Sequence, residues 1–288
     1  MRKLNTLLLS AALVVGGATV AQAAPASALP KAAKAQLTAV IDARSDTLKA
    51  RDSSRNPGAT IEFFGLLPGM KVAEVLPGGG WYTQILAPYV GTEGAIYGIN
   101  YADDMWPLFG FFSKEAITRS INSMDTFADR IASYAGDGMT ARGFAFGRVP
   151  ADLNGSLDAV VMVRALHNLN RFETKAGTRS AALQQINTLL KPGGIVGVVQ
   201  HRAPAAADDQ WANGSNGYLK QAAVVAMFEQ AGFELVASSE INANAKDKPG
   251  AEDSVWRLPP SLRTDPENKQ AMQAIGESDR MTLKFRKK

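Results

Sequence analysis

The chain has 288 residues, of which 46% are hydrophobic and 20% are charged, and its formal net charge is +4. This balance is that of an ordinary globular protein, and it excludes disordered, collagen-like and coiled-coil chains. The sequence has no cysteine, and its two histidines are His167 and His201. It therefore excludes disulfide scaffolds, thiolate zinc sites, iron–sulfur clusters and His-rich metal sites.

The first 23 residues have the pattern of a secretory signal peptide. Arg2 and Lys3 precede an apolar stretch from Leu7 to Val20, and Ala21-Gln22-Ala23 supplies an A-x-A cleavage site. The stretch contains two glycines and is shorter than the roughly 20 residues that a spanning helix needs. We therefore expect cleavage after Ala23 rather than a membrane anchor. The predicted mature protein is exported, periplasmic or secreted, without stable membrane insertion.

Residues 24–60 predict an N-terminal helical extension, and from Lys71 onward short apolar strands alternate with helices. The predicted strands lie at 71–76, 94–100, 140–147, 158–163, 195–200, 233–237 and 281–285. The predicted helices lie at 81–90, 113–134, 180–190 and 218–230. This alternation predicts an α/β fold with a doubly wound sheet. The basic run 284–288 is interpreted as a solvated chain end, and no nucleic-acid partner is expected.

Residues 242–279 do not follow the alternation and predict an irregular insertion. Four prolines lie among them, together with the apolar residues Val255, Trp256 and Leu258. A connection of this length is uncommon in a compact domain unless it has a purpose. It is either a lid over a site or an irregular segment held against the sheet by Trp256, and we favour the second interpretation.

A glycine-rich loop, Pro77-Gly78-Gly79-Gly80, follows the first predicted strand. In an open α/β sheet, ligands bind outside the carboxyl ends of the strands, and glycines let the backbone approach a ligand closely. A P-loop is excluded because Trp81 follows the glycines where a P-loop has lysine. A nicotinamide site is disfavoured because Thr83 occupies its third glycine position. No G-x-S-x-G elbow surrounds Ser215, which argues against a serine hydrolase.

The loop and two further segments resemble a known family. The segment 72–83, VAEVLPGGGWYT, resembles motif I of the class I S-adenosylmethionine-dependent methyltransferases. The segment 190–194, LKPGG, is similar to that family's L-K-P-G-G, and Ala231-Gly232-Phe233 opens a strand as it does in the family. More narrowly, the export signal, the segment 51–57 and the PGGGWYT block resemble exported bacterial predicted methyltransferases.

The resemblance implies a Rossmann-like methyltransferase fold over residues 61–288, with a seven-stranded, mostly parallel sheet and a C-terminal antiparallel strand. It implies S-adenosylmethionine as cofactor. The implied cofactor-binding residues are Glu74, Pro77, Gly78, Gly79, Gly80, Tyr82 and Asn100. Asn100 stands where the family has an acid for the ribose hydroxyls, although its amide oxygen can still accept one hydroxyl. Ala145 stands where the family has an acid near the adenine, and the flanking Phe144 and Phe146 could instead stack on a purine.

Both histidines follow neighbouring predicted strands, His167 after 158–163 and His201 after 195–200. They therefore lie at the sheet edge that carries the glycine loop. An unperturbed imidazole titrates near pH ~6.5, which suits a general base. Alternatively, each histidine caps a strand or bonds a backbone carbonyl. Arg164 and Asn168 either orient an anionic or polar acceptor or bond the loop backbone.

Two further groups of residues have more than one interpretation. Trp106, Phe109, Phe111 and Phe112 line an acceptor pocket or, as we favour, bury the helix that follows. Asp208 and Asp209 could hold a divalent ion together with His201, but their spacing is not diagnostic and we predict no metal site.

The sequence thus predicts a methyltransferase of the cell envelope that uses S-adenosylmethionine and has His167 or His201 as its base. Its acceptor is an unidentified small molecule or envelope component. The alternative is a non-catalytic protein of the same fold that binds a nucleoside-like small ligand. A nicotinamide-dependent oxidoreductase is a third, weaker alternative. The sequence does not indicate an oligomeric state.

Overall fold

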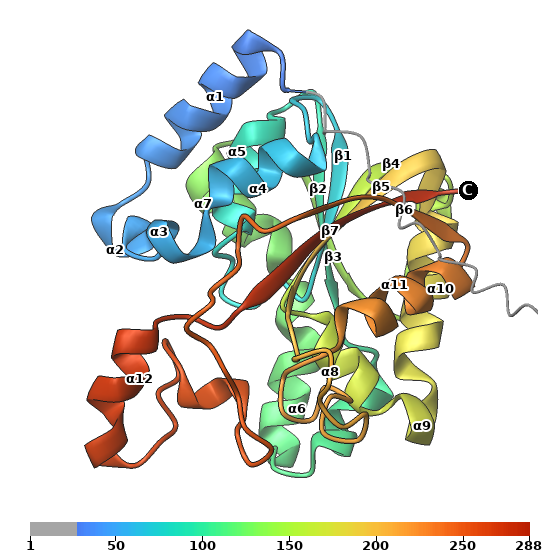
Figure 1. Cartoon of the computed structure of the whole chain (residues 1–288). Helices are drawn as coiled ribbons and strands as arrows, with labels where there is room; N and C mark the ends of the chain where they lie inside the picture. The colour runs from blue at the N-terminus through green and yellow to red at the C-terminus, as the bar shows by residue number, and fades with distance from the viewer. Residues whose placement is uncertain (1–27) are drawn as a thin grey trace, which may run out of the picture.

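A seven-stranded sheet runs through the molecule, with helices on both of its faces (Figure 1). The computed structural model describes residues 28–288, so the predicted signal peptide lies outside the described residues. The strands are β1 (Lys71–Val75), β2 (Ala95–Asn100), β3 (Thr140–Ala145), β4 (Leu157–Val163), β5 (Leu190–His201), β6 (Phe233–Ser239) and β7 (Arg280–Lys287). Their order in the sheet is β3-β2-β1-β4-β5-β7-β6, and β7 runs antiparallel to both of its neighbours. This confirms the predicted fold class.

The helices form two layers because each buried strand presents alternate side chains to opposite faces. They are α1 (Lys31–Asp42), α2 (Asp46–Lys49), α3 (Asp52–Arg55), α4 (Pro57–Phe64), α5 (Thr83–Val90), α6 (Lys114–Ile121), α7 (Phe127–Ala135), α8 (Leu166–Arg171), α9 (Glu173–Ala176), α10 (Thr178–Leu189), α11 (Gln221–Gln230) and α12 (Lys269–Ile275). Val72 and Ile96 pack with α4, α5 and α7, whereas Ala73 and Val75 face the core that includes α10 and α11. Figure 1 shows these two layers on opposite sides of the sheet.

The predicted helix at 113–134 is wrong in one respect, because the structure divides it into α6, a 3-10 turn and α7. The amide of Asn100, at the end of β2, donates to the Ser120 carbonyl at 3.2 Å and to the Ser123 hydroxyl at 3.1 Å. A side chain that bonds a helical carbonyl competes with the helix. The break also lets Phe127 pack directly on β2, where a Cβ at Gly98 would lie 2.5 Å from the Phe127 ring.

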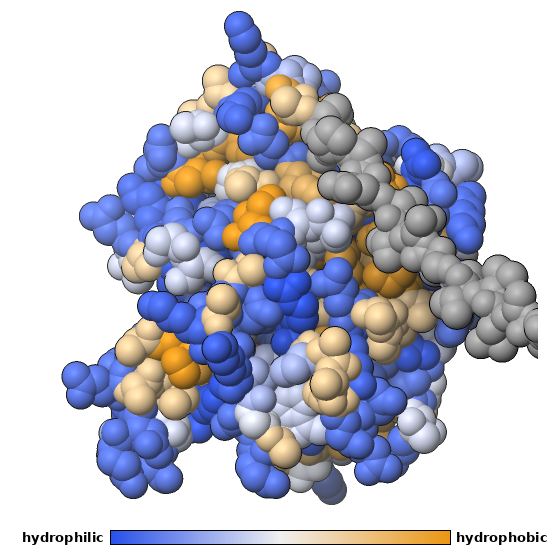
Figure 2. Space-filling view, viewed as in Figure 1, coloured by the Kyte–Doolittle hydropathy of each residue, from blue (hydrophilic) through white to orange (hydrophobic). Residues whose placement is uncertain are grey.

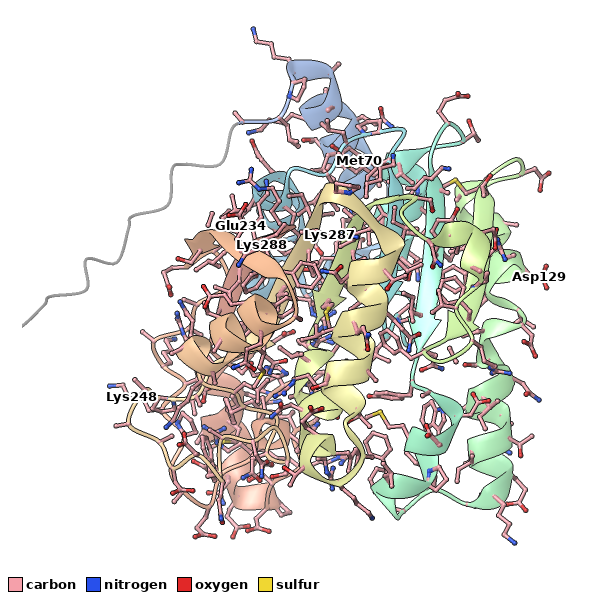
Figure 3. All side chains as sticks on the ribbon, turned by 90° about the vertical axis from the view of Figure 1, so that its right-hand side faces the viewer. Met70, Asp129, Glu234, Lys248, Lys287 and Lys288 are labelled. Carbon is pink, nitrogen blue, oxygen red and sulfur yellow. The ribbon has the colours of Figure 1, made fainter. Side chains whose placement is uncertain are left out.

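The basic run at 284–288 is not a solvated chain end, because residues 284–287 belong to β7 between β5 and β6. Phe285 is fully buried, and the Lys287 ammonium donates to the carbonyls of Asn187 and Leu190 at 2.6 and 2.9 Å. Figure 3 shows Lys287 and Lys288 beside Glu234 of β6. The strand is therefore fixed at both of its edges.

The two segments predicted to lie outside the alternation pack against this sheet. In the N-terminal part, α1 lies along α5, and the Gln36 amide donates to the Tyr89 carbonyl at 2.9 Å. Within 242–279 the chain is irregular except for α12 and two 3-10 turns. Of the three apolar residues Val255, Trp256 and Leu258, the first and last are buried and Trp256 is half-buried.

The surface of the described chain carries few large apolar groups. Figure 2 shows the apolar residues of one face scattered among hydrophilic ones. Between residues 28 and 288, Phe111 is the large apolar side chain with high exposure, at 68%. No helix in this range combines the length and apolar character that crossing a membrane requires.

Candidate functional site

The glycine-rich loop makes a sharp turn between β1 and α5. Leu76, Gly78 and Gly80 all have positive φ angles, of 55°, 53° and 80°. Leu76 therefore adopts a left-handed conformation that is uncommon for a residue with a side chain, and such strain often marks functional sites. The loop is supported from outside, because the Arg130 guanidinium donates to the Gly78 carbonyl at 3.1 Å. A Cβ at Gly79 would meet nothing within 4 Å, so the backbone there faces open space.

Two cavities lie on either side of this loop. The first, here called the histidine cavity, has a volume of about 470 Å³ and is lined by His167 and His201. The second, here called the asparagine cavity, has a volume of about 480 Å³ and is lined by Asn100. The two cavities share a set of wall residues: Leu76, Pro77, Gly78, Arg164 and Asn168. The two cavities are therefore adjacent and lie at the carboxyl edge of the sheet, where this fold class binds ligands.

Most of the predicted site residues line these cavities. Pro77, Gly78 and Gly79 lie in the wall of the histidine cavity, and Asn100 lies in the wall of the asparagine cavity. Gly80, Glu74 and Tyr82 are not wall residues of either cavity. The Tyr82 hydroxyl instead donates to the Arg55 carbonyl at 3.3 Å, beneath the loop.

Glu74 lies in the buried layer below the loop and accepts a hydrogen bond from the Thr83 hydroxyl. Burial raises the pKa of Glu74 to about 8, against smaller opposing effects from Thr83 and Arg130. The carboxyl group is therefore neutral at pH 7. It supports the loop as a hydrogen-bonding group and does not supply a negative charge to either cavity.

The structure brings the two histidines together, with ring centroids 5.3 Å apart. The side-chain oxygen of Gln200 accepts from the His167 backbone N–H and lies 3.2 Å from His167 Nδ1. Gln200 presents its amide nitrogen to the Gly217 carbonyl at 2.8 Å, so its oxygen faces His167. We therefore assign the proton of neutral His167 to Nδ1, which leaves Nε2 with its lone pair. His201 Nδ1 lies 2.6 Å from the Ser278 hydroxyl.

Both imidazoles are held in the neutral form. Burial, together with the nearby Arg164 and Arg171, lowers the pKa of His167 to about 4, against an opposing effect of its hydrogen bond with Gln200. Burial also lowers the pKa of His201 well below its usual value, helped by His167 and Arg164. A base with so low a pKa retains a proton poorly at pH 7. The histidines are thus better suited to orienting a ligand by hydrogen bonds than to the proton abstraction that their unperturbed pKa predicted.

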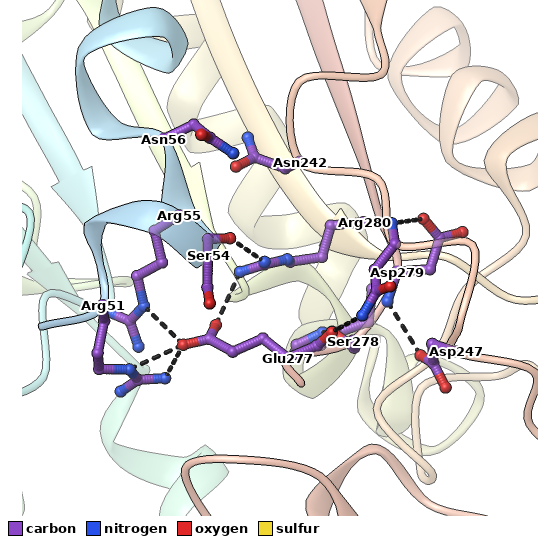
Figure 4. A network of polar contacts seen from close by, with 12 residues as sticks. Arg51, Ser54, Arg55, Asn56, Asn242, Asp247, Glu277, Ser278, Asp279 and Arg280 are labelled. Carbon is purple, nitrogen blue, oxygen red and sulfur yellow. Dashed lines mark hydrogen bonds and ion pairs between the residues drawn. The ribbon is translucent and has the colours of Figure 1, made fainter. Parts of the chain in front are cut away.

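A group of arginines surrounds Glu277 beside the histidine cavity, whose wall includes Arg51, Arg55 and Glu277. No role was predicted for this group from the sequence. Glu277 Oε1 accepts from Arg51 Nε at 2.8 Å and from Arg55 Nε at 3.4 Å, while Oε2 accepts from Arg280 Nη1 at 2.9 Å (Figure 4). Arg55 also lies over the Trp81 ring, 4.4 Å from its centroid. The only sequence signal for this group was the dense RDSSRNP block at 51–57.

Arg164 lies between the two cavities and lines both of them. It follows β4 with a φ of 56°, a second left-handed residue at this edge of the sheet. Its Nε is buried and has no hydrogen-bond partner among residues 28–288. Burial lowers the pKa of the guanidinium, whereas Glu277 opposes this effect. Arg164 was predicted either to orient an anionic acceptor or to bond the loop backbone, and its guanidinium makes no such bond in the described chain.

The asparagine cavity has a different wall. Asn100 Oδ1 accepts from the Tyr101 backbone N–H at 2.9 Å and can accept a second hydrogen bond. Arg119, Arg130 and Arg164 contribute positive charge, and no acidic residue lines this cavity. Trp106 also lines it, and its buried indole N–H has no partner within the described chain. Phe144 and Phe146, considered for purine stacking, are core residues outside this wall.

The acidic residues considered for a metal are engaged elsewhere. Asp208 accepts from the backbone N–H groups of Gln210 and Trp211, and Asp209 pairs with Lys220 at 2.6 Å. Among residues 28–288, no group of three histidine or acidic side chains is arranged to hold a metal ion.

The comparisons with known proteins give structural likenesses only. No protein-family model and no curated protein matches the chain. A SAM-dependent methyltransferase from Aquifex aeolicus has a TM-score of 0.48 and 15% identity, over 72% of this chain and 93% of that one. CrArsM, an arsenic(III) S-adenosylmethionine methyltransferase from Chlamydomonas reinhardtii, has a TM-score of 0.45 and 13% identity, over 90% of this chain and 74% of that one. These likenesses concern the arrangement of the chain and not the chemistry of the site.

Proposed function

We propose that this protein is an S-adenosylmethionine-dependent methyltransferase that acts on a small-molecule or envelope acceptor. The supporting observation is the bare backbone at Gly78 and Gly79, which separates two cavities at the carboxyl edge of the sheet. One cavity carries the residue at the ribose position of the family, Asn100, and the other carries both histidines. A donor in one cavity and an acceptor in the other would both lie against this loop. Group transfer requires its two partners to be held close together in this way.

The residues fit the uncharged parts of the cofactor. Gly78 brings backbone without a side chain into the wall of the asparagine cavity, and Asn100 Oδ1 can accept from a ribose hydroxyl. The Trp106 N–H, which has no partner in the described chain, offers a donor near an adenine. When bound, the cofactor supplies an electrophilic methyl group on a sulfonium. The chain contributes the orienting groups, with the Nε2 lone pair of His167 beside the acceptor.

The electrostatics of the asparagine cavity give the proposal a sharp test. S-adenosylmethionine has a sulfonium charge that S-adenosylhomocysteine lacks, and the wall carries arginines without a carboxylate. The product should therefore bind several-fold more tightly than the cofactor, because like charges repel in a partly buried site. Calorimetric titration of the mature protein measures both affinities. If neither compound binds at millimolar concentration, the proposed function is wrong.

The glycine loop provides the matching variant. Gly78→Asp places a carboxylate in the wall that both cavities share, where a Cβ would lie 3.9 Å from the Leu76 carbonyl oxygen. Aspartate tolerates the positive φ of this position better than most residues do. We expect at least a hundredfold loss of S-adenosylhomocysteine affinity, because the new side chain fills the position of the ligand. Asn154→Asp, on an exposed turn, adds the same charge and serves as the control. Unchanged binding in Gly78→Asp would show that the loop does not contact the ligand.

The absence of acids in the asparagine-cavity wall also favours the second candidate, a non-catalytic protein that binds a nucleoside-like ligand. Such a protein would use Arg119, Arg130 and Arg164 to hold an anionic group. Titration with adenosine monophosphate distinguishes the two functions. Affinity for this nucleotide well above that for S-adenosylhomocysteine would favour the binding protein, and the reverse would favour the methyltransferase.

We also propose that the protein works outside the cytoplasm, as the pattern of residues 1–23 predicts. Export would separate the enzyme from the cytoplasm, where its cofactor is made, so location and activity need separate tests. Fractionation of cells that express the full chain, with N-terminal sequencing of the product, tests the location. A mature chain that begins at Ala24 supports the proposal, and an uncleaved chain in the cytoplasm contradicts it.

A further inference from the structure

The arginines of the histidine cavity outnumber the carboxylates that could neutralise them. Arg51, Arg55 and Arg280 all bond Glu277, and Arg164 is close enough for Glu277 to affect its pKa. Three guanidinium groups therefore bond one carboxylate, and a fourth lies near it without bonding it. The wall residues of this cavity all belong to the described part of the chain, and Glu277 is the only acidic one among them.

The excess positive charge is largely buried. In bulk water the same charge would destabilise the fold only slightly. The side chains of Arg55 and Arg280 are 3% and 4% exposed, and that of Arg51 is 28% exposed. Burial and mutual repulsion lower the pKa values of Arg55, Arg164 and Arg280. Buried like charges without partners destabilise a fold, so their retention calls for a compensating group.

Arg164 is the member of this group that is free to bind a ligand. Its Nε has no hydrogen-bond partner among the described residues, and the ion pairs with Glu277 are made by Arg51, Arg55 and Arg280 instead. It is held at the cavity wall by a backbone in the left-handed region, which is sterically costly for arginine. Its neighbours in the wall are His167 and His201, which stay neutral and donate or accept hydrogen bonds without adding charge.

We propose that the histidine cavity contains an anion-binding subsite, in which Arg164, with Arg51 and Arg55, receives a carboxylate or phosphate group of the methyl acceptor. That the anion belongs to the acceptor rests on the proposed function, whereas the subsite itself does not. Arginine presents a planar fork that suits both kinds of oxyanion. Methylation of the carboxylate or phosphate oxygen itself would also fit the weakly basic histidines. Such an ionised oxygen has no proton that a base must remove before it receives the methyl group.

The subsite can be tested with simple anions. We would titrate the mature protein with inorganic phosphate and with acetate at constant ionic strength, using calorimetry and tryptophan fluorescence. Trp81 and Trp256 both line the cavity and report on its occupancy. Saturable binding of either anion is expected, and the tighter of the two identifies the preferred class of oxyanion. Lack of saturable binding of both would overturn the proposal.

Variants of Arg164 locate the binding. Arg164→Gln should weaken anion binding at least tenfold, and Arg164→Lys should restore part of it, because lysine keeps the charge but not the fork. Arg142→Gln removes the same charge from an exposed pair with Asp152 and should have no effect. Equal affinity in Arg164→Gln and the unmodified protein, or equal loss in Arg142→Gln, would show that binding is non-specific. Because Arg164 is repelled by the neighbouring arginines and has no ion-pair partner in the described chain, its loss should not lower the melting temperature.

Titration of S-adenosylhomocysteine into the same proteins separates this proposal from the proposed function. If S-adenosylhomocysteine binds but neither anion does, the subsite is wrong and the methyltransferase assignment stands. If an Arg164-dependent anion binds but S-adenosylhomocysteine does not, the subsite stands and the methyltransferase assignment falls.

Discussion

The histidine cavity and the asparagine cavity share one loop and one arginine, yet their walls differ in charge and in origin. The histidine cavity has Glu277 among its arginines, and the irregular segment at 242–279 forms part of its wall. The asparagine cavity is built mainly from the end of β2 and the segment 101–130 that follows it, and its wall contains no acid. The favoured prediction, an irregular segment held against the sheet by Trp256, was therefore too simple. Trp256 and Leu258 also form part of a cavity wall.

This difference shows how one sheet edge can present two kinds of binding surface. Neutral imidazoles and a partly compensated arginine cluster line the histidine cavity, and the anion-binding subsite proposed above rests on them. The asparagine cavity has an amide, aromatic rings and three arginines in its wall, and no acid compensates these arginines. The loop at Pro77–Gly79 separates these two environments, and three substitutions would change the contrast between them.

The largest effect is expected at Glu277, whose negative charge offsets the positive charge of the arginines around the histidine cavity. Glu277→Gln leaves Arg51, Arg55 and Arg280 without their common partner. Removing one member of a buried ion pair typically costs about 3–5 kcal/mol of unfolding free energy. Urea denaturation followed by circular dichroism measures the loss, and added phosphate should recover part of it.

An exposed ion pair provides the control for Glu277. Asp103 pairs with Arg148 at 3.0 Å, and both side chains are at least 40% exposed. Asp103→Asn should change the unfolding free energy by about 1 kcal/mol or less, because solvent screens exposed pairs. Similar losses in the two variants would mean that the Glu277 cluster is no more than a surface network.

The next effect concerns pH and the neutral histidines. The pKa of His167 is about 4 in the folded protein, below its ordinary value of 6.5. The unfolded chain therefore binds more protons between these values, and stability falls as the pH drops from 6.5 toward 4. The loss from His167 alone is on the order of 3 kcal/mol, since each unit of pKa shift corresponds to about 1.4 kcal/mol.

His167→Gln should remove this contribution from the pH dependence. Its unfolding free energy should decline less than that of the unmodified protein between pH 6.5 and pH 4, with parallel curves above pH 7. Denaturation series at several pH values measure both. Superimposable pH profiles would contradict the buried, neutral state of His167.

The smallest effect is expected at Asn100, where an acid would make the asparagine cavity more like the family pattern. Asn100→Asp should tighten S-adenosylmethionine binding about tenfold, equivalent to about 1.4 kcal/mol, because charge-assisted hydrogen bonds are stronger than neutral ones. The gain should be smaller for S-adenosylhomocysteine, which lacks the sulfonium charge. The variant should also lose about 1 kcal/mol of stability, since the amide donates to Ser120 and Ser123. Calorimetry that shows equal gains for both compounds would contradict the electrostatic argument.

The fold was predictable because its signals are local. Buried strands such as 158–163 read as continuous apolar runs, and the loop at 77–80 marks the end of β1 without ambiguity. The break between α6 and α7 was not predictable, because it depends on the side chain of Asn100 and on contact between Phe127 and Gly98. Both causes lie in a different element from the break itself.

The site was predictable only in part. Both histidines were correctly expected at the carboxyl edge of the sheet, since parallel strands end together there. Their lowered pKa values come from burial and from arginines, which a sequence does not reveal. The Arg51–Glu277 contact joins residues 226 positions apart, and no periodicity connects them. An unexplained density of arginines at 51–55 was the one available hint.

The place of β7 in the sheet has a consequence for how the chain acquires its structure during synthesis. This strand leaves the ribosome after the other six, yet β6 has no neighbour in the sheet until β7 arrives. Glu277 lies shortly before β7 in the chain, so it also emerges late in synthesis. Until it emerges, its carboxylate cannot offset the charge of Arg51 and Arg55. A nascent chain lacking these residues would expose an unpaired β5 edge, and is a natural target for a holding chaperone or a protease.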